Sequence, residues 1–245
     1  MEANIKGTTM PILEVGLAQG ENVVSAHGEL SWMTPDIRMS QTTATGGKSG
    51  LMQGLKRAAG GGGLFLTRYD GPGMVAFAAK APGHIITVDV TQGRHYYVHR
   101  HGWLCGTAGI IPGVGAHQTF RGGMFGGEGF LLQRLDGQGR AWIELSGEVT
   151  NYELPQERTL LVHPGHIGMF EGSVQFTITR IRGVANAMFG SDDVHLVALT
   201  GPGRIWLQSM PLPSLAGALS PFFATTQEAA GAGALGGMIG GMLRG

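Results

Sequence analysis

The chain has 245 residues, of which 44 are glycine and 11 are proline; 14% of the residues are charged and 42% are apolar. Glycine at this density argues against a helical bundle, because each glycine inside a helix costs roughly 1 kcal/mol relative to alanine, and the apolar content excludes an intrinsically disordered chain. Lys plus Arg and Asp plus Glu both total 17, so the net charge provides no general attraction to nucleic acid or to anionic membranes.

Three 18-residue windows align without gaps, over 60–77, 126–143 and 190–207. In each window, alternating apolar residues flank a Gly-x-Gly sequence, which is the pattern of a β-hairpin whose glycine supplies the positive φ of a tight turn. The window starts lie 66 and 64 residues apart. The expected turn glycines are Gly71, Gly73, Gly137, Gly139, Gly201 and Gly203.

A weaker motif precedes each window, over 28–37, 101–110 and 165–174. Its third, fifth and last positions are apolar in every copy, and this period of two predicts half-buried strands. The fifth positions are Trp32, Cys105 and Met169.

The chain therefore divides into three β-rich units, at about 5–90, 91–155 and 156–212. A unit of about 65 residues buries too little surface to be stable alone. We therefore expect the three units to share one core, in a single domain over residues 1–223.

Two short helices are expected beside the strands. One lies in an insertion of the first unit, where Leu51, Met52 and Leu55 would line one face, and the other spans Ser214 to Leu219. The remaining residues, 224–245, are rich in Gly, Ala and Met. We expect this tail to be disordered, or ordered only by a neighbouring subunit, a protein partner or a membrane surface.

The single cysteine, Cys105, rules out an internal disulfide framework and is typical of a reducing compartment. The first 20 residues carry Glu2, Lys6 and Glu14 and lack the apolar core of a secretory signal. No stretch approaches the ~18 consecutive apolar residues of a membrane span. These features predict a cytoplasmic protein.

Several segments, taken in chain order, resemble the mitochondrial biogenesis AIM family. They include IKGTTMPILEVGLAQGENVVSAHGELSWMTPDI near the start, LMQGLKRAAGGGGLFLTRYDGPGMVAF, and GPGRIWLQSMPL near the end. The resemblance covers about residues 5–222. It implies a bacterial member with an all-β, TRAP-like fold, similar to the tryptophan RNA-binding attenuation protein, which is a form of double-stranded β-helix. It implies no activity, although the fungal member is linked to inner-membrane organisation in mitochondria.

The segment HYYVHRHGWLC, residues 95–105, is the best candidate for chemistry. In an unbroken strand, His95, His99, His101 and Cys105 would share one face, and a His-x-His pair with a thiolate can ligate zinc or iron. The pair also resembles the first cupin motif, but the glutamate of that motif is absent. We therefore expect no metal and no cofactor. A cupin-like barrel that binds a metal or small ligand at His99 and His101 is the alternative function.

Trp142 and Trp206 recur at one repeat position, which predicts packing in the core or at a subunit interface. The neighbouring Arg140 and Arg204 would suit RNA stacking in a TRAP-like protein, but the neutral net charge makes a nucleic-acid partner the weaker interpretation. The low charge and the need to cover strand edges favour a non-enzymatic structural or interaction protein. We expect a homo-oligomer, with a trimer favoured.

Overall fold

The structure is a computed structural model that describes residues 1–43, 65–118, 130–181 and 194–223. Within these residues the chain forms antiparallel β-sheets, one α-helix and one short 3-10 helix. The all-β class predicted from the glycine content and the period of two is therefore confirmed. The expected helix around Leu51 to Leu55 and the tail 224–245 lie outside the described residues.

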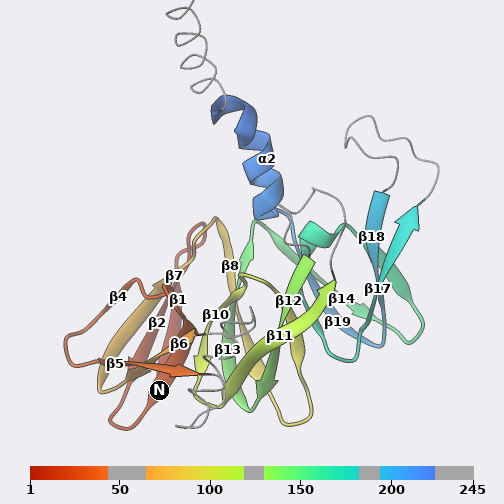
Figure 1. Cartoon of the computed structure of the whole chain (residues 1–245). Coiled ribbons are helices and arrows are strands. Elements are labelled where there is room, and N and C mark those ends of the chain that lie inside the picture. The colour runs from red at the N-terminus through yellow and green to blue at the C-terminus, as the bar shows by residue number, and fades with distance from the viewer. Residues whose placement is uncertain (44–64, 119–129, 182–193, 224–245) are drawn as a thin grey trace, which may run out of the picture.

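Four sheets follow one another from the N-terminal to the C-terminal part of the described chain (Figure 1). The first has four strands in the hydrogen-bonded order β1 (Glu2–Lys6), β2 (Ile12–Leu17), β7 (Gly73–Ala78) and β4 (Trp32–Met33). The second has six, in the order β5 (Arg38–Thr43), β6 (Phe65–Asp70), β3 (Asn22–Ala26), β10 (Trp103–Thr107), β13 (Gly139–Ser146) and β8 (Gly83–Val90).

The third sheet also has six strands, in the order β11 (Ile110–Gln118), β12 (Phe130–Gly137), β9 (Tyr96–His99), β16 (Ile167–Glu171), β19 (Gly203–Gln208) and β14 (Val149–Leu154). The fourth has three, in the order β15 (Thr159–Val162), β18 (Val194–Thr200) and β17 (Gln175–Ile181). A 3-10 turn, η2 (Pro164–His166), follows β15, and helix α2 (Leu212–Phe223) follows β19.

The two six-stranded sheets have the same construction. Each consists of two three-stranded halves, and the halves meet where β3 pairs with β10 and where β9 pairs with β16. In these two junctions Ser25 lies opposite Cys105, and Val98 lies opposite Met169. The first and fourth sheets each contain one such half, so β4 and β15 are edge strands in the described chain.

The three glycine windows are not hairpins, which corrects the sequence prediction. In each window the two strands belong to different sheets: β6 and β7, β12 and β13, and β18 and β19. The Gly-x-Gly segment therefore turns the chain from one sheet into the next. Gly73, Gly139 and Gly203 begin the outgoing strands with φ of 140°, 148° and 140°. A local pattern predicts the turn but carries no information on which strands pair across it.

The core contains three clusters of buried side chains, and successive parts of the chain contribute to the same cluster. Phe77 from β7 packs in one cluster with Trp142 from β13. Leu135 from β12 shares the second cluster with Ile143 from β13 and Met169 from β16. Burial of apolar surface therefore couples one sheet to the next along the molecule.

Helix α2 is longer than predicted, because it extends from Leu212 to Phe223 rather than from Ser214 to Leu219. It stands away from the sheets (Figure 1), and its residues from Leu212 to Phe222 are all exposed. Among the helices of the described residues, none has the length and apolar character needed to cross a membrane.

Candidate functional site

Residues 95–105 do not form one strand, so the common face predicted for His95, His99, His101 and Cys105 is wrong. Strand β9 ends at His99, a turn follows, and β10 begins at Trp103 in a different sheet. The turn is closed by a hydrogen bond from the Gly102 N–H to the His99 carbonyl oxygen at 2.9 Å. Because Gly102 lies against the His99 ring, a larger residue would not fit there.

The His99 ring has a structural partner. Its Nε2 lies 3.0 Å from the backbone carbonyl oxygen of Glu144 and donates to it. Burial lowers the pKa of His99 to about 4, only partly opposed by that hydrogen bond. His99 is therefore neutral at physiological pH and is fixed in place by the backbone of β13. His101 lies on the turn, where partial burial and then the charge of Arg100 lower its pKa.

The other two candidate ligands lie elsewhere. Cys105 is fully buried, opposite Ser25 of β3 and Trp142 of β13, and burial raises the pKa of its thiol well above the usual value. His95 precedes β9, with its ring 5.2 Å from that of Tyr97 in an edge-on arrangement. In the part of the chain that the structure describes, no group of three or more His, Cys, Asp and Glu side chains is placed to hold a metal ion. The ligand set of the cupin-like alternative is thus not brought together.

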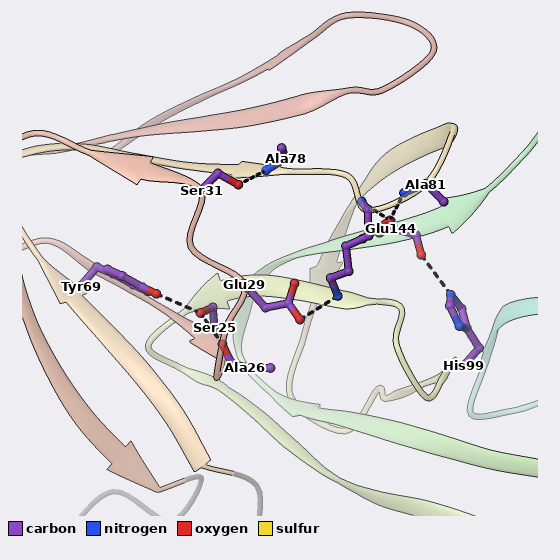
Figure 2. A network of polar contacts seen from close by, with 10 residues as sticks. Ser25, Ala26, Glu29, Ser31, Tyr69, Ala78, Ala81, His99 and Glu144 are labelled. Atoms are coloured by element: carbon purple, nitrogen blue, oxygen red, sulfur yellow. Dashed lines mark hydrogen bonds and ion pairs between the residues drawn. The ribbon is translucent and has the colours of Figure 1, made fainter. Parts of the chain in front are cut away.

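A buried polar network surrounds Glu144 at the place where the first three sheets meet (Figure 2). The Glu144 Oε1 accepts hydrogen bonds from the backbone N–H groups of Lys80, at 2.7 Å, and Ala81, at 3.3 Å. The Lys80 Nζ binds Glu29 Oε1 at 2.7 Å. The network anchors the segment after β7 to β13, and Glu144 also presents its carbonyl oxygen to His99. The paired atoms of this network hold strands of different sheets together.

The Glu144 carboxyl is only half satisfied. Its Oε2 is buried and has no hydrogen-bond partner among the described residues, and burial is the main cause that raises the pKa of Glu144. Gln208 takes the same place in β19: its Oε1 accepts from the Ser146 N–H at 3.0 Å, and its Nε2 donates to the Gly165 carbonyl oxygen at 3.1 Å. An uncharged amide at this position can therefore accept the same backbone hydrogen bond that the Glu144 carboxylate accepts from Lys80.

Replacing Glu144 by glutamine is expected to stabilise the chain at neutral pH by roughly 1 kcal/mol, because a buried charge with an unpaired oxygen is removed. The folded pKa of Glu144 is raised, so its contribution to stability is fully present below its unfolded pKa and is lost as the pH rises through its folded pKa. Urea unfolding of Glu144→Gln should lack this loss. The reverse change, Gln208→Glu, is the matched control and should destabilise. A Glu144→Gln protein less stable than the wild type at neutral pH would contradict this account.

The two tryptophans differ in their surroundings. Trp142 is only 1% exposed and belongs to the core, so it is not available to an interface. Trp206 is partly buried, with its ring 6.2 Å from that of Tyr96 and the Arg204 guanidinium 5.8 Å from its centroid.

Both arginines considered for RNA stacking form ion pairs on the protein surface. Arg204 pairs with Glu153 at 2.9 Å, and Arg140 pairs with Asp89 at 3.3 Å. Because each guanidinium already has a carboxylate partner, this arrangement does not favour RNA.

The strongest candidate for a functional surface is formed by the free edges of β4 and β15. Trp32 and Met33 on β4 are 42% and 36% exposed, and Leu161 on β15 is 49% exposed. Cys105 and Met169, which align with Trp32 in the other two repeats, are both 0% exposed. The repeat pattern had identified Trp32 as a strand residue, but Leu161 was missed. Its signal is the apolar pair Leu160–Leu161 in a short strand of the last unit.

The chain matches the model of the family "Mitochondrial biogenesis AIM24" over residues 3–210. It belongs to this family. The matched region of this AIM24 chain contains every strand from β2 to β19, and helix α2 follows it. The resemblance drawn from the sequence is therefore confirmed.

Two proteins from Streptococcus pyogenes are similar to this chain. An uncharacterized protein of the serotype M6 strain is 24% identical over 226 residues, which is 89% of each chain. An X-ray crystal structure of a protein from the same species has a TM-score of 0.70 and 20% identity, over 90% of this chain and 99% of that one. At this identity the second likeness establishes the AIM24 fold and carries no further conclusion.

Proposed function

We propose that this AIM24 chain is a non-enzymatic scaffold of the bacterial cytoplasm. We propose further that each chain consists of three repeated units and that several copies of the chain assemble into a homo-oligomer. The units would be β2 to β7, β8 to β13 and β14 to β19, with six strands each. This moves β8 and β14 into the second and third units, whereas the boundaries expected from the sequence, after residues 90 and 155, put them in the first and second. In every unit the first, sixth and third strands lie side by side in one sheet, and the fourth, fifth and second lie side by side in another. For example, β7, β13 and β19 each lie beside the third strand of their own unit, which is β4, β10 or β16.

The pairing register supports the repeat at the level of single residues. Trp32 lies opposite Ala76, Cys105 opposite Trp142, and Met169 opposite Trp206. These are the same positions that the sequence motifs align. An equal register at three places in one chain is the expected result of a triplicated unit.

The observation that carries the scaffold proposal is the difference between equivalent strands. The counterparts of β4, which are β10 and β16, each have a partner on both sides, whereas β4 has one only on the side of β7. The counterparts of β15, which are β3 and β9, likewise have two partners, whereas β15 has only β18. An exposed apolar strand edge is a template for pairing with another chain. Because the two free edges belong to different strands, pairing would be head-to-tail, which gives a closed ring when the rotation between copies closes and an open filament when it does not. The proposed scaffold is the closed ring.

The polar groups of the described residues support a structural role over a catalytic one. The Glu144 carboxylate binds two backbone N–H groups, and the His99 imidazole binds a carbonyl oxygen. Both groups therefore maintain strand positions. In this scaffold, residues 224–245 would provide a separate contact for a protein partner or a membrane surface, and no nucleic acid is required.

The proposal is tested by the mass of the full-length protein in solution. Sedimentation or light scattering is expected to give a trimer of about 77 kDa, three times the 25.7 kDa of one chain. The same mass should persist on dilution to the low micromolar range, because a closed ring leaves neither β4 nor β15 unpaired. A particle of 25.7 kDa at all concentrations would show that the chain is not a homo-oligomeric scaffold.

A further inference from the structure

We infer that copies of the chain join through one strand pair of defined register, in which β4 of one copy adds antiparallel to β15 of the next. This inference rests on the proposed self-association and specifies the surface that performs it. The three opposed pairs, one residue from each copy, are Trp32 with Val162, Met33 with Leu161, and Thr34 with Leu160.

The register follows from the two junctions already present within the chain. In the first junction Val24 of β3 lies opposite Gly106 of β10, and in the second Tyr97 of β9 lies opposite Phe170 of β16. Both junctions are antiparallel. A third junction of the same kind needs one strand equivalent to β3 and β9 and one equivalent to β10 and β16. The chain has one of each left over, on opposite ends of its series of sheets.

The position of β15 in this scheme is fixed by its neighbour β18, which is equivalent to the neighbours β6 of β3 and β12 of β9. Leu161 lies opposite Ala198, Tyr97 opposite Arg134, and Val24 opposite Arg68. These three partners each occupy the ninth position of an aligned 18-residue window. Leu161 is therefore the counterpart of Val24 and Tyr97.

The position of β4 follows in the same way. Met33 lies opposite Val75, Gly106 opposite Ala141, and Phe170 opposite Ile205. The three partners again share one position in the aligned windows. Met33 is therefore the counterpart of Gly106 and Phe170, so in a third junction it would oppose Leu161.

The side chains at this place show what such a junction does. Directly opposed residues point to the same face and touch across an antiparallel pair. The rings of Tyr97 and Phe170 lie 5.2 Å apart, and Phe170 is 1% exposed. Met33 and Leu161, by contrast, are both exposed in the single chain. Pairing β4 with β15 would cover these two side chains together with Trp32.

The chemistry of the two edges suits a second copy of this chain. None of the six opposed residues is charged or is a proline, so the edges lack the lysines and prolines that block edge-to-edge pairing. Five of the six residues, all except Thr34, have a counterpart that is apolar in at least one internal junction. The partner is therefore an uncharged apolar strand, which β15 offers to β4.

The register is tested by cysteine cross-linking of the full chain. Met33→Cys with Leu161→Cys should, on mild oxidation, form a ladder of covalent dimers and trimers on a non-reducing gel, since opposed Cβ atoms lie within disulfide reach. Cys105 is fully buried and serves as an inert background thiol. In the control, Met33→Cys with Leu160→Cys, the two thiols fall on opposite faces, and the ladder should be lost.

Each outcome has a definite meaning. A covalent dimer from Met33→Cys alone would mean that β4 pairs with β4 of another copy, and it would overturn the inference. An oligomer of wild-type mass without a ladder from the opposed pair would also overturn it, while leaving the scaffold intact. A wild-type chain that is monomeric would remove both proposals.

A second pair of variants decides the question without thiol chemistry. Leu161→Lys should place a charge on the proposed junction and reduce the particle mass threefold, to one chain. Tyr152→Lys is the matched control, because Tyr152 is similarly exposed, at 47%, but lies on β14. It should keep the wild-type mass. A Leu161→Lys protein of wild-type mass, with far-ultraviolet circular dichroism showing normal folding, would overturn the inference.

Discussion

Acidification from about pH 7 to about pH 4 is expected to destabilise the folded chain by about 3 kcal/mol through His99 alone. The neutral ring donates from Nε2 to the Glu144 carbonyl oxygen and is partly buried, and this burial lowers its pKa from 6.5 to about 4. A base whose folded pKa is depressed contributes stability above its unfolded pKa, and this contribution is lost as the pH falls through the folded pKa. The loss should therefore begin near pH 6.5 and be nearly complete near pH 4.

The effect is measured by urea unfolding at fixed protein concentration across this pH range, in the wild type and in His99→Gln. Glutamine can donate to the same carbonyl oxygen but does not titrate. His101 and His163, whose pKa values are also lowered, act in the same direction, and Glu144, whose pKa is raised, acts in the opposite one. These groups are present in both proteins, so the difference in slope reports His99.

The control for this comparison is His27→Gln, at an exposed position. It should keep the wild-type loss of stability on acidification. If His99→Gln retained the same loss, the partly buried neutral imidazole would not be its source.

The strands of the three aligned windows could be predicted from the sequence, but their partners could not. Apolar alternation and glycine are local signals, and they placed β6 and β7 on either side of the turn at Gly71 and Gly73. The pairing of β6 with β3 and β5 depends on contacts with segments distant in the chain. No residue inside the window encodes them. A hairpin and a corner between two sheets have the same local requirement, which is a glycine with positive φ.

The candidate site shows the same division. Trp32 could be aligned with Cys105 and Met169 because all three are apolar at one repeat position. Whether that position is covered depends on a second neighbouring strand. Within the described chain β10 and β16 each have a strand on both sides, whereas β4 has only β7. For the His95–Cys105 segment, Gly102 was the available signal of a break. The prediction of one strand followed the His-x-His pattern instead of this glycine.

Replacing Gly203 by alanine is expected to destabilise the folded chain strongly. Gly203 begins β19 with φ of +140°, a conformation that costs an L-residue roughly 1–3 kcal/mol. An added Cβ would also lie 2.5 Å from Ser173 Oγ and 2.9 Å from Val174 Cγ2. Since Val174 is buried in the third core cluster, its side chain cannot move away without disturbing the packing, which adds roughly 1–3 kcal/mol.

The expected total is a loss of roughly 3 kcal/mol, which lowers the Tm of a chain of this size by roughly 6–12 °C. Differential scanning calorimetry of Gly203→Ala measures it directly. Gly217→Ala is the matched control, because a Cβ there meets no atom within 4 Å and Gly217 lies in the exposed helix α2. Alanine should leave the Tm unchanged or raise it slightly, since it favours a helix by up to about 1 kcal/mol over glycine. If Gly203→Ala melted at or above the wild-type temperature, the backbone at this corner would have to accept a side chain, and the close packing of β19 against Val174 would not be a source of stability.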